Sequence, residues 1–201
     1  MACNTSLLPS GYKQVEYIRS TGTQYINSGL LSSLTLGIEM DVKFDAYGDG
    51  LCGTLIYPRY ALGTHNSLGL IYLRGNTYAS NIIGYQPLLD TKYKLRFNYE
   101  NSMNICLLDE NGVLLGNLYN IPSETVSNGD FNILANTTNG TTYYYYKAKL
   151  YRAKMTSGVT LVRDFVPCVQ MSDNSVGMFD LVSRTFFGSA GSEDFFAGPD
   201  V

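Results

Sequence analysis

Two acidic residues of this sequence, Glu39 and Asp41, come closest to a catalytic pair. Retaining glycoside hydrolases need two carboxyl groups about 5–5.5 Å apart on one face of a cleft. Alternate residues of a strand share a face, so Glu39 and Asp41 would lie together, but Lys43 occupies the next position of that face instead of another acid. A glycoside hydrolase is therefore a disfavoured alternative, and we expect the protein not to be an enzyme. The solvated face of an ordinary strand accounts for all three residues.

Other catalytic arrangements lack the residues that they need. The single histidine, His65, lies in a turn-like segment, and neither a Gly-x-Ser-x-Gly nucleophile motif nor a phosphate-binding loop is present. The cysteines are far apart and form no Cys-x-x-Cys pair, which excludes a zinc ribbon. We expect these cysteines to be free, buried thiols, although disulfide pairing stays open: they are Cys3, Cys52, Cys106 and Cys168.

Calcium is the one cation that a loop of this chain suits. Residues 45–50 read Asp-Ala-Tyr-Gly-Asp-Gly and bring the carboxylates of Asp45 and Asp49 together with flexible backbone carbonyls. Oxygen ligands on loops are what Ca²⁺ prefers, although the spacing is not that of an EF-hand. A plain Asp/Gly turn explains the same residues, and no other cofactor is expected.

Tyrosine-rich segments point to carbohydrate binding. Sugars stack their apolar faces on aromatic rings while amides and charged groups bind the hydroxyls, and a chain without Trp must use Tyr for this purpose. Packing of these rings in the core, or against a second subunit, stays open. Two sets of candidate glycan-binding residues stand out: Tyr57, Arg59, Tyr60, His65, Asn66, Tyr72, Arg74 and Tyr78 in the first, Tyr143 and Tyr145 in the second.

The elements that must position these residues are strands. Apolar and polar residues alternate through residues 38–44 and in many later segments, while turn residues such as Asn111-Gly112 separate them. No window shows a capped helical period. Within residues 146–155 the apolar residues change from even to odd positions, which predicts a β-bulge near Leu150 and Tyr151. Short strands at regular spacing predict an all-β sandwich or jelly roll.

Composition sets further bounds on fold and partners. The chain has 201 residues, 45% of them hydrophobic and only 15% charged, with a net charge of −3. A chain of this length and hydrophobic content is enough for one domain with its own core. The absence of a basic excess disfavours nucleic acid, and no apolar run is long enough for a membrane span. The first residues do not look like a signal peptide.

The opening and closing segments carry a resemblance to a known group. Residues 8–29, and residues 146–168 continuing through 176–183 to 197–200, resemble the concanavalin A-like (laminin G-like) jelly-roll modules of phage and prophage structural proteins from gut bacteria. The resemblance implies a two-sheet antiparallel jelly-roll sandwich over residues 8–201, preceded by an arm of residues 1–7. It also implies a place on a virion or tail surface.

Together these expectations describe a non-enzymatic component of a phage virion surface. It would decorate a capsid or tail, or act as an adhesion module that binds bacterial or mucosal glycans. Its expected partners are other virion proteins, cell-surface or mucin glycans and a second copy of itself, without nucleic acid or membrane. A free-standing Ca²⁺-dependent lectin is the first alternative.

Overall fold

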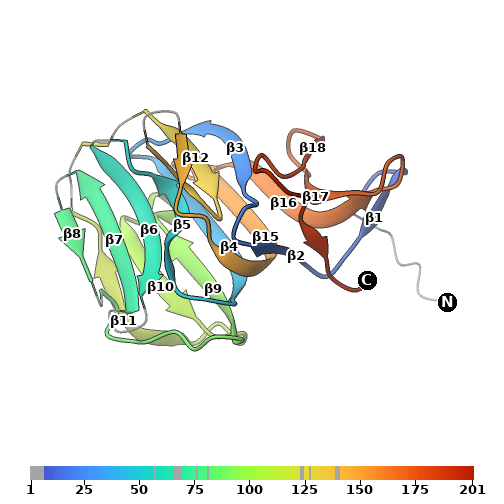
Figure 1. Cartoon of the computed structure of the whole chain (residues 1–201). Coiled ribbons are helices and arrows are strands. Elements are labelled where there is room, and N and C mark those ends of the chain that lie inside the picture. The colour runs from blue at the N-terminus through green and yellow to red at the C-terminus, as the bar shows by residue number, and fades with distance from the viewer. Residues whose placement is uncertain are drawn as a thin grey trace.

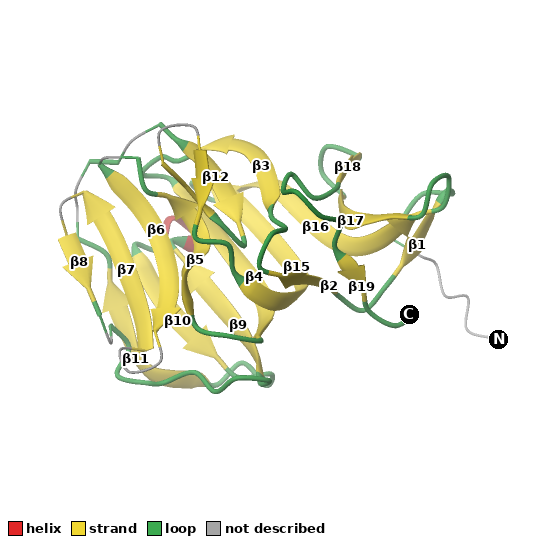
Figure 2. Ribbon diagram, viewed as in Figure 1, coloured by secondary structure: helices red, strands yellow, loops and turns green. Residues whose placement is uncertain are grey.

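The protein is a sandwich of two curled β-sheets (Figures 1 and 2). The computed structural model describes residues 7–201 except 57, 66–68, 76, 81, 123–124, 127 and 139–140, and it does not describe the side chains of 49, 71, 73–75, 77–78, 138 and 143. All strand pairs within the described residues are antiparallel except β13 with β5. The all-β, two-sheet antiparallel sandwich predicted from the sequence is confirmed.

The larger sheet contains eleven of the described strands. Its main path runs in the order β11 (Leu114–Asn120), β10 (Asn104–Leu108), β9 (Lys92–Phe97), β4 (Leu36–Phe44), β15 (Lys147–Ser157), β16 (Thr160–Gln170), β17 (Ser175–Asp180) and β18 (Thr185–Phe187). Three short strands extend it: β1 (Tyr12–Gln14) on β16, β2 (Ile18–Thr21) on β15, and β19 (Phe196–Ala197) on β2.

The smaller sheet packs over part of the larger one (Figure 1). It has eight described strands, of which six follow the order β14 (Thr141–Tyr143), β13 (Asn136–Thr138), β5 (Gly48–Thr54), β6 (Arg59–His65), β7 (Gly69–Gly75) and β8 (Thr77–Ala79). The other two are β12 (Asp130–Ile133), which pairs with β5, and β3 (Ile26–Leu31), which pairs with β12. One 3₁₀ turn, η1 (Tyr99–Asn101), follows β9.

The main core lies between the sheets and is built by alternation. On β4 the side chains of Ile38, Met40, Val42 and Phe44 are completely buried. The residues between them point to the outer face of the larger sheet, as the pattern predicts. Aromatic rings from both sheets fill the centre, and burial of such rings is a major part of folding free energy.

Two local predictions are confirmed. The pairing of β15 with β4 shifts register between Leu150 and Arg152, which is the bulge that the parity change predicts. Strands β10 and β11 form a hairpin through Asn111 and Gly112, where Gly112 takes a left-handed φ of 81°. The described cysteines, Cys52, Cys106 and Cys168, are free and buried, and Cys3 lies outside the described residues.

Early and late segments of the described chain lie together at one side of the larger sheet (Figure 1). Val15 forms a bridge with Asp200, and β19 pairs with β2. Phe195 enters the main core, whereas Phe196 is 58% exposed. Within the described part of the chain, no helix is long and apolar enough to cross a membrane.

Candidate functional site

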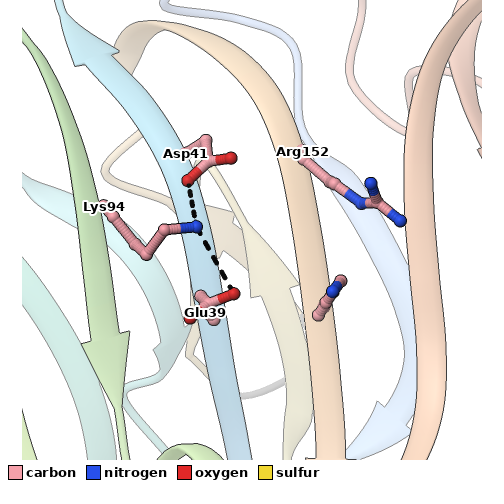
Figure 3. A pocket seen from close by; sticks show the side chains of 5 residues that line it. Glu39, Asp41, Lys94 and Arg152 are labelled. Atoms are coloured by element: carbon pink, nitrogen blue, oxygen red, sulfur yellow. Dashed lines mark ion pairs between the residues drawn. The ribbon is translucent and has the colours of Figure 1, made fainter. Parts of the chain in front are cut away.

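The Glu39–Asp41 pair lies on the outer face of the larger sheet, among cations (Figure 3). Lys94 Nζ on β9 lies 2.8 Å from Asp41 Oδ1 and 3.5 Å from Glu39 Oε1. Arg96 Nε donates a 2.7 Å hydrogen bond to Glu39 Oε2. Ion pairs to a neighbouring strand thus engage both carboxylates, whereas a general acid must be able to donate a proton to the leaving group.

The hollow beside this pair is small. Arg152 lines it but points away from both acids (Figure 3), and its guanidinium binds Asp164 on β16 through contacts of 2.9 and 2.8 Å. The cavity volume is about 110 Å³, below the roughly 300 Å³ at which small-molecule pockets begin. The arrangement is a charge network on the outer face of the larger sheet, in which the Glu39 side chain is only 11% exposed rather than solvated.

The first tyrosine set does not form one exposed platform. Tyr60 and Tyr72 are both 0% exposed and belong to the main core, so their rings cannot stack on a sugar. Tyr60 stacks on Phe97 with centroids 4.6 Å apart. This part of the glycan-site prediction is wrong, because β6 and β7 turn these rings toward the opposite sheet.

The remaining residues of that set are spread out. Arg59 begins β6 and is half-buried, whereas His65 ends the same strand six residues on. Arg74 on β7 and Tyr78 on β8 lie on neighbouring strands, but their side chains are not described. Two predicted glycan-binding residues lie outside the described residues: Tyr57 and Asn66.

The second set breaks the expected alternation. Strand β14 ends at Tyr143, whose side chain is not described, and Tyr144 then takes a left-handed φ of 55°. Tyr144 and Tyr145 are consequently both exposed, while Tyr146 is buried and bonded to Thr64. Tyr145 is 39% exposed and packs against Tyr25, so this residue remains available to a ligand.

A larger cleft lies beside the connection between β4 and β5. Its volume is about 470 Å³, within the range of small-molecule sites, and its lining includes Asp45, Tyr47, Gly48, His65 and Leu89. The Tyr47 hydroxyl donates a 2.9 Å hydrogen bond to the Pro87 carbonyl, which fixes the ring at the cleft wall. The cleft thus brings the predicted metal-loop residue Asp45 together with the predicted glycan residue His65.

The Asp45 carboxylate is engaged by cations. Arg19 Nε donates a 2.6 Å hydrogen bond to Asp45 Oδ2, and Lys149 Nζ lies 3.9 Å from Oδ1. These positive charges oppose a calcium ion at the same oxygens. The Asp49 side chain is not described, and no group of three His, Cys, Asp or Glu suited to a metal occurs among the described residues.

Sequence reasoning overlooked three contributors to this region. Tyr47 stands inside the predicted calcium loop, so its position beside Asp45 was a usable signal. Leu89 and Arg19 reach the region only through long-range pairing of strands, which no local pattern encodes.

Comparisons with known proteins do not assign the chain to a family. No protein-family model matches the chain, and searches of curated proteins and of solved structures found no match.

Proposed function

We propose that this protein is a non-enzymatic recognition module that binds a glycan in the cleft at Asp45, Tyr47 and His65. The observation that carries the proposal is the cleft itself, which has the volume of a ligand site and joins an aromatic ring, an imidazole and a fixed carboxylate. Such a mixture of apolar surface and a few oriented polar groups suits a sugar. The rigid sandwich behind it holds the loop in place.

The proposed setting is the surface of a phage virion. This rests on the resemblance of residues 8–29 and 146–200 to phage and prophage jelly-roll modules. In that setting the module decorates a capsid or tail, contacts other virion proteins, and presents the cleft to bacterial or mucosal glycans.

A glycan array with the purified protein tests the cleft. We expect binding to a defined subset of bacterial or mucin glycans, weakened roughly tenfold by Tyr47→Ala or His65→Ala because each removes a wall of the cleft. Tyr144→Ala is the matched control, since it removes an exposed tyrosine that belongs neither to the cleft lining nor to the predicted glycan-binding residues. A blank array, or equal losses in all three variants, would contradict the proposal.

Calcium dependence separates the proposal from the lectin alternative. Since Arg19 and Lys149 occupy the Asp45 carboxylate, we expect the same array signal in calcium and in chelator. Loss of the signal in chelator would favour a Ca²⁺-dependent lectin.

The absence of hydrolysis is a separate expectation. Lys94 and Arg96 engage the two carboxylate oxygens of Glu39, and the hollow beside it is smaller than a small-molecule pocket, so we expect no release of reducing ends from β-glucans by the native protein. The Glu39→Gln variant serves as the baseline in the same assay. Release by the native protein that Glu39→Gln abolishes would overturn the non-enzymatic assignment.

A further inference from the structure

Four cations stand side by side across four neighbouring strands of the larger sheet. Lys92 on β9 is the cross-strand partner of Lys43 on β4, and Lys43 is in turn the partner of Lys149 on β15. On the other side of β15, Lys149 pairs with Arg19 on β2. Strands lie about 4.8 Å apart, so this cation row spans roughly 14 Å.

The neighbouring rows of the same face follow a different rule. In the next row Lys94, Asp41 and Arg152 are successive partners and alternate in sign. In the row beyond it the order is Arg96, Glu39, Lys154 and Asp164, which again alternates. Opposite charges across strands stabilise a sheet and like charges oppose it. Folding stability therefore accounts for the two alternating rows but not for the cation row.

Nearby acids neutralise the cation row only in part. In the described part of the chain, the carboxylates that pair with it are Asp45, shared by Arg19 and Lys149, and Asp90, 3.2 Å from Lys43. The Asp90 side chain is 75% exposed, and such surface pairs contribute little. Ion pairs thus match the four cations with two carboxylates, while Asp41, Asp109 and Glu110 line a hollow with Lys92.

Two tyrosine rings flank the cation row. Tyr17 and Tyr151 pack edge to face with centroids 5.3 Å apart, and both remain partly exposed. Lys92 Nζ lies 4.2 Å from the Tyr151 ring centre and Lys149 Nζ lies 5.5 Å from that of Tyr17. Burial first, and then charges such as those of Glu16 and Asp45, raise the pKa of Tyr151 to about 12. Its hydroxyl is thus a neutral hydrogen-bond donor at physiological pH.

We propose that the cation row, with Tyr17 and Tyr151, binds an acidic polysaccharide through its carboxylate or sulfate groups. The proposal rests on the proposed function and names the class of glycan. Asp45 lines the cleft and also pairs with two members of the row, so one glycan chain extends from the cleft onto the row.

The charge density favours a polysaccharide over a nucleic acid. Four cations that share two paired carboxylates over roughly 14 Å suit a polymer in which only some of the sugars carry an acidic group. Double-stranded DNA carries about one charge per 1.7 Å, and the negative chain as a whole repels so dense a polyanion. The tyrosine rings then stack on the apolar faces of sugars.

The Lys43→Gln variant of the full chain tests this proposal. It removes the cation that has a like charge on both sides, so we expect an unfolding midpoint no lower than that of the native protein. Binding to immobilised polygalacturonate and heparin should fall about tenfold and depend less steeply on salt. If Lys43 served folding alone, Lys43→Gln would lower the unfolding midpoint and leave binding to both acidic polymers unchanged.

Lys13→Gln is the matched control, because it removes the same charge from an exposed lysine on β1 that pairs with Asp200. It should leave binding to both acidic polymers unchanged. If only neutral glycans bind, and Lys43→Gln leaves that binding intact, the cation-row proposal fails while the cleft proposal stands. If no glycan of either kind binds, both fail. Tight binding of a single-stranded oligonucleotide that Lys43→Gln weakens, without binding of acidic glycans, would overturn the polysaccharide assignment.

Discussion

Replacing Asp180 by alanine is expected to lower the free energy of unfolding by about 3–5 kcal/mol, a large part of the stability of an ordinary domain. Its side chain on β17 is completely buried. The carboxylate accepts hydrogen bonds from the backbone amides of Asp164 at 2.7 Å and of Val182 and Ser183 at 3.1 Å each. Arg163 Nε lies 3.6 Å away and supplies a positive charge. Alanine leaves these buried donors without an acceptor.

The same contacts predict how the effect of Asp180 depends on pH. Burial alone raises the pKa of this carboxyl group, but hydrogen bonds from Ser183, Asp164 and Val182 together outweigh it, and the pKa lies below its ordinary value of 3.8. A pKa lower in the folded than in the unfolded state stabilises the fold above the unfolded value, and this stabilisation is lost as pH falls through the folded value. The difference between native protein and Asp180→Asn should therefore be full at pH 7 and shrink below about pH 4.

Urea unfolding at pH 7 and pH 3 measures both effects. The control is Asp173→Asn, because Asp173 also accepts a turn amide, from Ser175, but is exposed to solvent. We expect its unfolding midpoint to match that of the native protein. If Asp180→Asn and Asp173→Asn behaved alike, the buried carboxylate would not be the centre of the turn between β17 and β18.

Local patterns were sufficient for the elements of the fold. Alternation over residues 38–44 predicted which side chains of β4 are buried, and the change of parity predicted the bulge after Leu150. The Asn111-Gly112 turn predicted the hairpin of β10 and β11. These features depend on residues close in sequence, so a single sequence is enough to reveal them.

The candidate site depended on information that no local pattern holds. A period of two says which residues share a face but not which face lies inside, so the sequence leaves open whether Tyr60 and Tyr72 bind a glycan or point into the core, as they do. The cation row arises from the register of β9, β4, β15 and β2, whose members are far apart in the chain. Only long-range pairing places those cations together.

Tyr60→Ala is expected to cost about 3–5 kcal/mol of unfolding free energy, as for other large-to-small changes in a core. The ring is completely buried, stacks on Phe97 and lies 6.2 Å from Phe131 between centroids, so alanine leaves a cavity at the centre of the sandwich. Tyr60→Phe should cost about 1 kcal/mol, because the ring stays in place while the hydroxyl and its hydrogen bond to the Leu36 carbonyl are removed. That carbonyl keeps a 3.1 Å hydrogen bond from the Asn98 side chain.

Thermal unfolding and glycan binding measured on both Tyr60 variants decide how binding data are interpreted. Because Tyr60→Ala removes core packing, a loss of binding in this variant would accompany a loss of folded protein and would not locate a ligand. Tyr60→Phe keeps the fold and should bind as the native protein does. A Tyr60→Ala protein that unfolds at the native temperature yet binds no glycan would instead place the ring at the ligand, against its burial in the structure.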